Sequence, residues 1–349
     1  MCSKELQEDL ITLSTYIEQL DISGNTVLVT GTTGLIGSLI VKAFITFNQR
    51  HSNKIKVIGM ARDRQKVREV YKDFLKERDT ITDVDFVYQD VCSAISDEVT
   101  CDYIIHTANP TSSKFFITNP VEVIECIYTG TRQILEYARC NKIKGVVYLS
   151  SMEVFGYVKN TERITEQELG YLDIQNVRSS YSESKRLAEC MCKSYAKEYG
   201  VPVKIARLSQ TFGAGVSSFE NRVFAQFARS AIRGEAIILH TLGKSVGNYC
   251  YTTDAIRAIL LLLTKGEDGE AYTVVNEETT MSIAEMANLV ADNFSGGKSK
   301  VVFNILDNDL CGYAPDTEMR LSSKKMRRLG WKPRVGLVEA YRRMLPDLF

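Results

Sequence analysis

Three glycines spaced three residues apart, Gly31, Gly34 and Gly37, follow a short apolar run near the start of the chain. The run 27–29 is predicted to be a buried parallel strand, and apolar residues recur at helical spacing over 35–44. A strand, a glycine turn and a helix in this order place a helix N-terminus under a pyrophosphate. We therefore expect a dinucleotide-binding turn. Gly31 would make the tight turn, Gly34 would let backbone N–H groups approach the phosphates, and Gly37 would allow close packing.

Apolar strands and amphipathic helices alternate from these glycines to about residue 209. This alternation is typical of a Rossmann-type, doubly wound parallel α/β sheet. Beyond residue 209 it breaks down, which indicates a smaller C-terminal α/β lobe closing over the carboxyl ends of the strands. The later strands are expected at 56–61, 85–91, 102–106, 145–150 and 203–208, and helices at 63–78, 120–140 and 181–199. The expected organisation is a helical extension at 1–24, a Rossmann domain at 25–209 to which segments near 248–276 return, and a substrate-binding lobe at 210–247 and 277–349.

Charge and composition argue against several kinds of partner. Lys+Arg and Asp+Glu both number 43, so no net field recruits nucleic acid or an anionic membrane. No apolar run approaches membrane-spanning length, and the first 24 residues lack the apolar core of a signal peptide. Nine cysteines without CxxC pairing and three distant histidines predict reduced thiols and no metal site. We therefore expect a cytoplasmic protein that binds a small molecule.

Tyr181 and Lys185 lie one turn apart on the same face of a predicted helix. Because a free tyrosine has a pKa of about 10, lowering it to about 7 needs roughly 4 kcal/mol of differential stabilisation of the phenolate. Lys185 and the positive ring of an oxidised nicotinamide would supply it. The strand at 145–150 leads to Ser150 and Ser151, at the rim where reactants bind. A serine there can hydrogen-bond a substrate oxygen and relay its proton to the tyrosine.

Together these motifs resemble the extended short-chain dehydrogenase/reductase family. The resemblance rests on the three glycines, on Tyr181 with Lys185, and on the segment 150–156, which is similar to the family segment that carries a catalytic Ser or Thr. In that segment the catalytic residue stands four positions before the aromatic Phe155, which selects Ser151. The family includes epimerases, 4,6-dehydratases, decarboxylases and reductases. The resemblance therefore implies an NAD(P)-dependent enzyme that modifies a nucleotide sugar through a transient keto intermediate.

The resemblance also implies a set of binding residues. In the family, the loop after the fourth strand lines the cofactor, and the pair matching Asp90 and Val91 contacts its adenine. A homodimer is implied as well, with the helices near 120–140 and 181–199 packed into a four-helix bundle. The implied cofactor-binding residues are Gly31, Thr33, Gly34, Leu35, Ile36, Gly37, Asp90, Val91, Thr107, Ala108, Tyr181 and Lys185, and the implied substrate-binding residues are Asn109, Arg178, Gln210 and Arg320.

Within the family, the run 176–186 most resembles the UDP-glucuronate decarboxylases. Glu153 stands two positions after Ser151, where decarboxylases and 4,6-dehydratases carry a functional glutamate. Two roles remain open for Glu153: a base or ring contact beside a newly formed 4-ketone, or a carboxylate that caps a nearby loop. Dehydratases have an acid immediately after the Ser or Thr. Met152 stands there in this chain, which argues against dehydration.

Three positions depart from the family pattern. Ile127 replaces an asparagine in the long helix, and Gln210 replaces one after the sixth strand. The arginine that family members place on the substrate diphosphate is Gly247 in this chain. Lys244 or Arg222 is an alternative basic residue for that role, which leaves the sugar nucleotide open.

The end of the second strand bears on the type of cofactor. NAD selectivity usually needs an acidic residue there, whereas this chain has Arg62 and Arg64. Arginines suit a 2′-phosphate, which they bind through charge-assisted hydrogen bonds. We therefore favour NADP over NAD, the alternative being two solvated arginines at a helix start.

Two other functions remain open. One is an NADP-dependent carbonyl reductase acting on a non-nucleotide ketone, which Arg62 and Gly247 favour. The other is a non-catalytic NADP(H)-sensing protein, against which the intact set of Ser151, Tyr181 and Lys185 argues.

Overall fold

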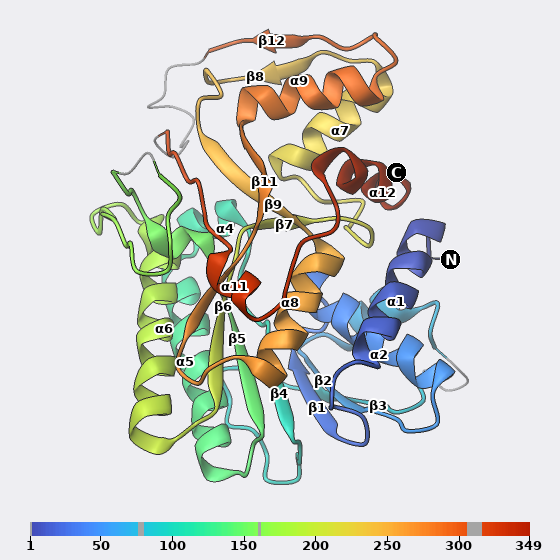
Figure 1. The fold of residues 1–349 in the computed structure, drawn as a ribbon, viewed down its shortest axis with the longest axis vertical. Coiled ribbons are helices and arrows are strands. Elements are labelled where there is room, and N and C mark those ends of the chain that lie inside the picture. Colours follow the sequence, from blue (N-terminus) through green and yellow to red (C-terminus); the bar gives the residue numbers. More distant parts are fainter. Residues whose placement is uncertain (1, 76–79, 160–161, 306–315) are drawn as a thin grey trace.

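A seven-stranded parallel sheet forms the centre of the molecule. The computed structural model describes residues 2–75, 80–159, 162–305 and 316–349. The strands run in the order β10-β6-β5-β4-β1-β2-β3 (Figure 1). Their bounds are Thr26–Thr30 (β1), Lys56–Ala61 (β2), Val84–Tyr88 (β3), Tyr103–His106 (β4), Gly145–Ser151 (β5), Val203–Leu208 (β6) and Ala271–Val274 (β10). This topology confirms the predicted doubly wound α/β sheet. The strand order reverses between β1 and β4, which is where ligands bind in such folds.

Both faces of the sheet are covered by helices. In β1, Val27 and Val29 pack into one apolar core and Leu28 into the other, because successive side chains of a strand point to opposite faces. The first face is covered by α2 (Leu35–Arg50) and α8 (Thr252–Lys265), and the second by α5 (Pro120–Cys140) and α6 (Ser179–Tyr199) (Figure 1). Burial on both faces explains why the strand is a continuous apolar run.

Two predicted elements are shorter than expected. The helix predicted over 63–78 is α3 (Arg64–Tyr71), and residues 76–79 lie outside the described part of the chain. At its end the Tyr71 hydroxyl donates to Thr32 O at 2.7 Å, and Phe74 beyond it packs against the core. The strand predicted over 85–91 ends at Tyr88. The chain turns beyond it, where the Asp90 carboxylate accepts the N–H of Cys92 at 2.9 Å.

The region after β6 builds a second, smaller apolar core. Phe212 lies at its centre, stacked on Phe224 at a ring distance of 4.4 Å and packed against Tyr341 at 5.1 Å. Three strands form one small sheet and two form another, while α8 and β10 lie with the large sheet. The small sheets contain β7 (Gln210–Phe212), β9 (Val246–Tyr251) and β11 (Asn276–Ser282), then β8 (Ile237–Leu239) and β12 (Val301–Phe303), and the helices around this core are α7 (Val223–Arg233), α9 (Ile283–Phe294) and α12 (Leu337–Leu348).

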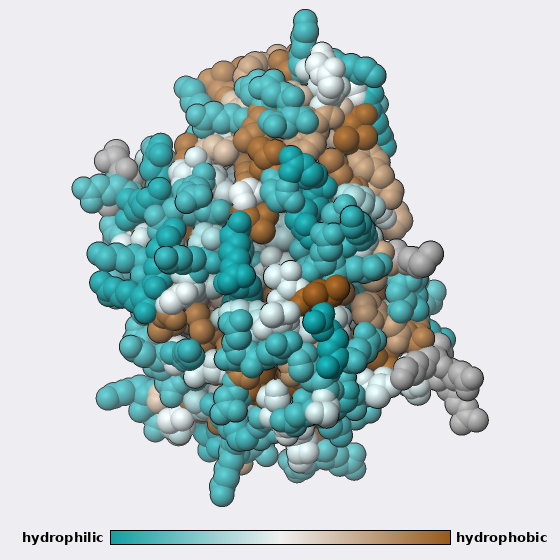
Figure 2. Space-filling view, turned by 45° about the vertical axis from the view of Figure 1, so that its right-hand side comes forward, coloured by the Kyte–Doolittle hydropathy of each residue, from teal (hydrophilic) through white to brown (hydrophobic). Residues whose placement is uncertain are grey.

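The N-terminal helix α1 (Lys4–Ile17) packs against α2, α8 and α12 (Figure 1). Its apolar residues join the core on the α2 face, while Asp9 is 7% exposed and lies between the two parts of the molecule. The Asp9 carboxylate accepts hydrogen bonds from the hydroxyl of Tyr251 in β9 and from Arg343 in α12. Burial raises the pKa of Asp9 to about 6. Figure 2 turns this side of the molecule forward and shows mainly hydrophilic side chains, with hydrophobic ones in smaller patches.

Among the described residues, no helix is both long and apolar enough to cross a bilayer. The same residues contain no group of three or more His, Cys, Asp or Glu side chains that could hold a metal ion.

Candidate active site

The glycine turn joins β1 to α2 and packs closely against the loop that follows β4. Gly31 has φ 67°, and a Cβ there would lie 2.8 Å from the Cα of Ala108. A Cβ on Gly37 would lie 2.4 Å from Gly31 O and 2.7 Å from Thr107 Oγ1. Gly34, by contrast, is exposed, and a Cβ there would lie 3.4 Å from Gly31 O, an ordinary van der Waals distance. The first and third glycines are therefore required by packing, whereas Gly34 leaves the N-terminus of α2 open.

A buried histidine holds this loop in place. The N–H groups of Thr107 and Ala108 donate to Thr30 Oγ1 at 3.2 and 3.1 Å, so the Thr30 hydroxyl is free to donate to His106 Nδ1 at 2.9 Å. His106 Nε2 then carries the hydrogen and faces Thr131 Oγ1 at 3.4 Å. Burial lowers the pKa of His106 to about 3, so its ring stays neutral. The Thr30–His106 contact was not predicted, although the two residues are register partners in β1 and β4.

The N-terminus of α2 and the neighbouring loops fit a dinucleotide. Gly34 caps this 16-residue helix without a side-chain hydrogen bond, so the first N–H groups of the helix remain available to phosphate. Thr33, Leu35 and Ile36 are only partly buried at this end. Both amide atoms of Asn109, and Nε2 of Gln89, are buried without a hydrogen-bond partner. Buried polar atoms of this kind call for a bound partner.

Basic and acidic side chains meet at the ends of β2 and β3. Arg62, whose side chain is 79% exposed, lies 3.5 Å from Asp90 Oδ2, and the guanidinium of Arg64 lies 4.5 Å from the ring centroid of Tyr88. The hydrogen bond from Cys92 N–H, together with Arg62, holds the pKa of Asp90 below its usual value. Val91 is buried beneath them. The two predicted cofactor residues Arg62 and Asp90 are thus brought together as an ion pair.

Ser151, Tyr181 and Lys185 come together at the carboxyl end of β5. The side chain of Ser151 lies close enough to the Tyr181 hydroxyl to favour its ionised form, and the Tyr181 ring stacks on Phe116 of α4 (Ser113–Thr118) at 4.1 Å. Lys185 is 1% exposed, lies 5.8 Å from the Tyr181 ring centroid, and donates from Nζ to Leu149 O at 2.6 Å. The helical spacing that predicted a Tyr/Lys pair therefore places both residues at one site.

The protonation of this pair differs from the sequence expectation. Burial raises the pKa of Tyr181, and the nearby Glu153 carboxylate raises it further. Burial also lowers the pKa of Lys185 to about 7. Because desolvation outweighs the favourable effects of Ser151, Arg178 and Arg222 on the phenolate, Tyr181 keeps its proton in the chain alone. The expected lowering of its pKa therefore depends on groups that arrive with the ligands.

Glu153 and Arg178 form an ion pair beside the Ser151–Tyr181–Lys185 group. Glu153 lies in the short helix η2 (Met152–Phe155), and Arg178 precedes α6. Arg178 Nη1 and Nη2 donate to the two carboxylate oxygens of Glu153 at 2.9 and 3.2 Å, and Ser182 Oγ donates to the same carboxylate at 3.1 Å. Both residues were predicted site residues, but no sequence pattern indicated that they would bind each other.

A second, fully buried pair lies behind the same strand end. Arg207 donates to Glu189 from Nε at 3.0 Å and from Nη2 at 2.7 Å, and Ser150 Oγ donates to Glu189 Oε1 at 2.5 Å. Glu189 follows Lys185 by one helical turn, and its charge raises the pKa of Lys185 against the effect of burial. Sequence reasoning missed this pair. The i, i+4 spacing of Lys185 and Glu189 indicated that Glu189 lies on the same helix face as Lys185, but no pattern indicated Arg207.

Two of the predicted substrate residues bind partners outside this group. Gln210 begins β7 and pairs with Tyr249 of β9, while Arg320 donates to Glu318 at 2.8 Å. Within the described chain, no hydrogen bond or ion pair joins Gln210 or Arg320 to Ser151, Tyr181 or Lys185. Their substrate contacts stay a prediction.

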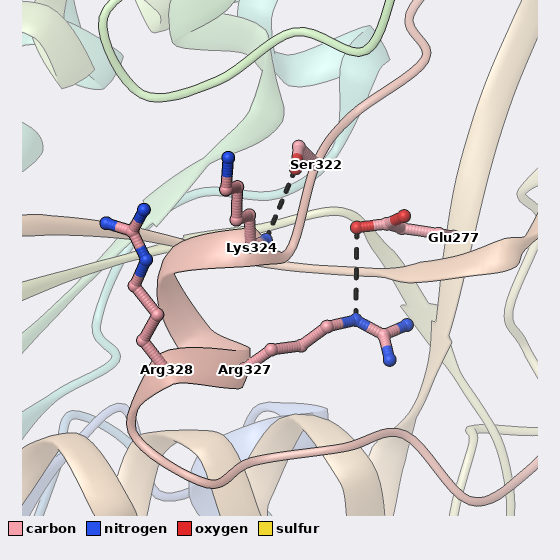
Figure 3. A pocket seen from close by; sticks show the side chains of 5 residues that line it. All are labelled: Glu277, Ser322, Lys324, Arg327 and Arg328. Atoms are coloured by element: carbon pink, nitrogen blue, oxygen red, sulfur yellow. Dashed lines mark hydrogen bonds and ion pairs between the residues drawn. The ribbon is translucent and has the colours of Figure 1, made fainter.

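A separate cavity of about 490 Å³ adjoins α11 (Lys324–Arg328) (Figure 3). Arg327 points toward Glu277, whereas Lys324 and Arg328 point away from that carboxylate. None of the predicted site residues contributes to its lining, which consists of Glu277, Ser322, Lys324, Arg327 and Arg328.

Comparisons with known proteins bear on this arrangement. A family model described as "NAD dependent epimerase/dehydratase family" matches residues 27–276. UDP-glucuronic acid decarboxylase 3 of Arabidopsis thaliana is 31% identical over 265 residues, which cover 75% of this chain and 74% of that protein. UDP-glucuronic acid decarboxylase 6 of the same plant is 29% identical and covers 92% of this chain and 88% of its own. Human dTDP-D-glucose 4,6-dehydratase is 24% identical, and the match covers 78% of this chain and 77% of that protein.

Solved structures share the fold. A UDP-glucose 4-epimerase from Thermotoga maritima superposes with a TM-score of 0.74 at 22% identity, covering 92% of this chain and 98% of its own. The dTDP-glucose 4,6-dehydratase DesIV from Streptomyces venezuelae, with NAD and TYD bound, superposes with a TM-score of 0.73 at 23% identity. This match covers 92% of this chain and 96% of that one. The family match spans the glycine turn, all of β5 and all of α6. As the motifs indicated, this chain therefore belongs to the NAD-dependent epimerase/dehydratase family of enzymes.

Proposed function

We propose that this enzyme modifies a nucleotide sugar through a transient ketone, using NAD(P). The observation that carries the proposal is the group of Ser151, Tyr181 and Lys185 where the carboxyl end of β5 meets the first turns of α6. Ligands of open parallel sheets bind outside the carboxyl ends of the strands. The relatives named for UDP-glucuronic acid and dTDP-D-glucose support a nucleotide sugar as substrate.

Each member of the group has its own task in this proposal. The side chain of Ser151 acts on the Tyr181 hydroxyl, so a sugar hydroxyl bound to both would be oriented by Ser151 and would pass its proton to Tyr181. Lys185 brings a positive charge near the Tyr181 ring and favours the phenolate. A bound nicotinamide dinucleotide would supply the hydride acceptor. The glycine turn and Asn109 would hold that dinucleotide.

We infer that NADP is preferred over NAD. Arg62 and Arg64 lie at the end of β2, and Arg62 is mostly exposed, with Asp90 as its ion-pair partner. A 2′-phosphate would offer these guanidinium groups a second, more highly charged partner than Asp90 alone. The family match supports NAD-type cofactors in general.

The proposed reaction is decarboxylation of a nucleotide hexuronate. The charge of Glu153 acts on Tyr181, which supports a carboxylate next to the expected ketone. Met152 cannot donate a proton to a departing hydroxide, so dehydration is disfavoured. The decarboxylases among the relatives support the same choice.

The smaller lobe at 210–247 and 277–349 is proposed to bind the nucleotide diphosphate. No atom lies within 4 Å of a Cβ built on Gly247, so this position leaves open space where the family pattern has an arginine. Arg222, at the start of α7, acts electrostatically on Tyr181 and pairs with Glu220 at 2.7 Å. We therefore propose that Arg222 binds the substrate diphosphate in place of the family arginine.

A homodimer is proposed on the outer face of α5 and α6. This face carries apolar side chains that are 36–72% exposed, an unusual gathering for helices in contact with water. A second copy packing its own α5 and α6 there would bury them in a four-helix arrangement. The side chains are Val121, Ile124, Tyr128 and Leu187.

The proposal is tested by mass spectrometry of the purified protein incubated with NADP or NAD and a panel of UDP- and dTDP-sugars. We expect loss of carbon dioxide from a nucleotide glucuronate. Consumption of NADPH with a non-nucleotide ketone alone would instead indicate a carbonyl reductase. Cofactor binding without turnover of any substrate would indicate an NADP(H)-sensing protein.

Glu153→Gln separates decarboxylation from simpler hydride chemistry. The substitution keeps the shape of the side chain and removes its charge. If Glu153 serves the step at C5, the sugar is still oxidised at C4, and reduced cofactor accumulates by absorbance without product. Near-normal turnover would contradict the decarboxylation proposal and favour an epimerase or a reductase.

A further inference from the structure

The carboxylate of Glu153 is fully engaged in the chain alone. Arg178 donates to both of its oxygens in the bidentate geometry that guanidinium groups form with carboxylates, and Ser182 adds a third hydrogen bond. This pair is neither buried nor freely solvated, because the side chains of Arg178 and Glu153 are 27% and 23% exposed. An incoming anion can therefore reach the guanidinium.

The pair lies at the sugar-reacting end of the site. Glu153 is two residues beyond Ser151, and its N–H donates to Ser151 Oγ at 3.2 Å. Arg178 is three residues before Tyr181, and its guanidinium lies 6.0 Å from the ring of Phe116, which itself stacks on Tyr181. An anion bound to Arg178 would therefore sit next to the reacting carbon atoms rather than at the diphosphate.

We propose that Arg178 binds the carboxylate of the substrate sugar, and that the substrate thereby displaces Glu153 from Arg178. A hexuronate carboxylate offers the guanidinium the same pair of oxygens that Glu153 supplies in the free chain. The exchange leaves Glu153 held only by Ser182 and free to act on the ring. A neutral hexose cannot drive this exchange. The inference rests on the proposed nucleotide-sugar function and names the group that recognises the substrate.

Binding measurements on the full chain test the exchange. All variants carry Tyr181→Phe to block turnover, and NADP is present throughout. Calorimetric titration compares glucuronate and glucose linked to UDP, and the same two sugars linked to dTDP. We expect Arg178→Gln to weaken binding of the glucuronate form roughly ten- to a hundred-fold, the range of one charge-assisted pair, and binding of the glucose form less than about three-fold. The affinity of Arg178→Lys for the glucuronate form should lie between those of the parent and of Arg178→Gln, because an ammonium cannot make the bidentate contact.

Glu153→Gln is the decisive second variant. It removes the internal competitor for Arg178, so glucuronate binding should tighten while glucose binding stays unchanged. If Arg178 merely oriented Glu153, both substitutions would shift binding in the same direction. The matched control is Arg342→Gln, which breaks an exposed ion pair with Glu339 on α12 and should leave both titrations unchanged.

The outcomes separate this inference from the proposed function. Equal weakening of glucuronate and glucose forms by Arg178→Gln would assign Arg178 to the shared diphosphate and overturn the inference alone. Unchanged binding in Arg178→Gln would overturn it too. If the parent protein binds none of the four nucleotide sugars, the proposed function fails, and the inference fails with it.

Discussion

Two glutamate–arginine pairs flank the end of β5, and they differ mainly in burial. Glu189 and Arg207 have side chains 10% and 6% exposed, whereas Glu153 and Arg178 are 23% and 27% exposed. Both arginines donate to their carboxylate from two nitrogen atoms. The buried pair also anchors the chain through Ser150 and through Glu166 O, to which Arg207 donates at 3.0 Å.

The difference indicates two roles for one kind of contact. Removing one partner of a buried pair leaves an uncompensated charge in a medium that solvates it poorly. A partly exposed pair such as Glu153–Arg178 opens more readily, because water or a ligand can replace the lost partner. We therefore regard Glu189–Arg207 as the fixed support of the strand end and Glu153–Arg178 as the exchangeable contact of the site.

Tyr181→Phe has the largest expected effect, and it tests whether chemistry depends on the tyrosine rather than on either ion pair. Turnover should fall by several orders of magnitude, because the proton relay is lost, while cofactor affinity stays within a few-fold. Steady-state kinetics with a cofactor titration measures both. If the variant keeps more than a tenth of the parent activity, Tyr181 is not the base.

Matched glutamine substitutions in the two pairs test the comparison directly. Glu189→Gln should lower the free energy of unfolding by about 3 kcal/mol, the low end for a broken buried pair, since the amide oxygen still accepts hydrogen bonds. Glu153→Gln should lower it by less than about 1 kcal/mol. Urea unfolding of both variants gives the two values. Similar losses would remove the distinction between a fixed and an exchangeable pair.

Lys185 lies next to the buried pair and should make stability depend on pH. Its pKa is lowered by burial to about 7, while the unfolded chain keeps the ordinary value of about 10.4. Between these values the unfolded state binds the extra proton, so stability should rise with pH, by at most about 1.4 kcal/mol per unit. Lys185→Met should abolish this rise. Urea unfolding of the ligand-free parent and variant at pH 7 and 9 measures this rise. An equal rise in both proteins would contradict the assignment of the rise to Lys185.

Arg62 and Asp90 extend the comparison to a third, mostly exposed pair, for which the smallest effect is expected. Arg62→Ala should weaken NADP binding about ten-fold, near 1.5 kcal/mol, and NAD binding less. Asp90 would then face the 2′-phosphate without its partner. Fluorescence titration with both cofactors measures the ratio. Equal losses for NADP and NAD would contradict the NADP preference.

Local patterns predicted the sheet, the long helices and the meeting of Tyr181 with Lys185. These features depend on residue spacing within one element or on the alternation of strands and helices, which a sequence displays directly. The helix bounds 120–140 agree with α5, and the helix predicted from Tyr181 begins two residues earlier, at Ser179.

Partners distant in sequence were not predictable in the same way. Glu153 and Arg178 are 25 positions apart, and Thr30 and His106 are 76 positions apart, so their contacts depend on how separate elements pack. The raised pKa of Tyr181 in the chain without ligands was not predictable for a related reason. The sequence shows a cation one turn away, but it does not show that burial removes the water that would stabilise the phenolate.

The contacts of α1 have a consequence for exchanging parts between relatives. Both α1 and α12 lie outside the segment 27–276 that matches the family, yet Ser3 Oγ donates to Asp347 at 2.9 Å and Arg343 donates to Asp9 at 2.8 Å. Asp347 also accepts the N–H of Gly215, just after β7, at 2.7 Å. The two ends of the chain are therefore joined to each other, and Asp347 joins them to the smaller lobe. A chimera that takes one end from a relative should take the other from the same relative, or the charges at this junction will be mismatched.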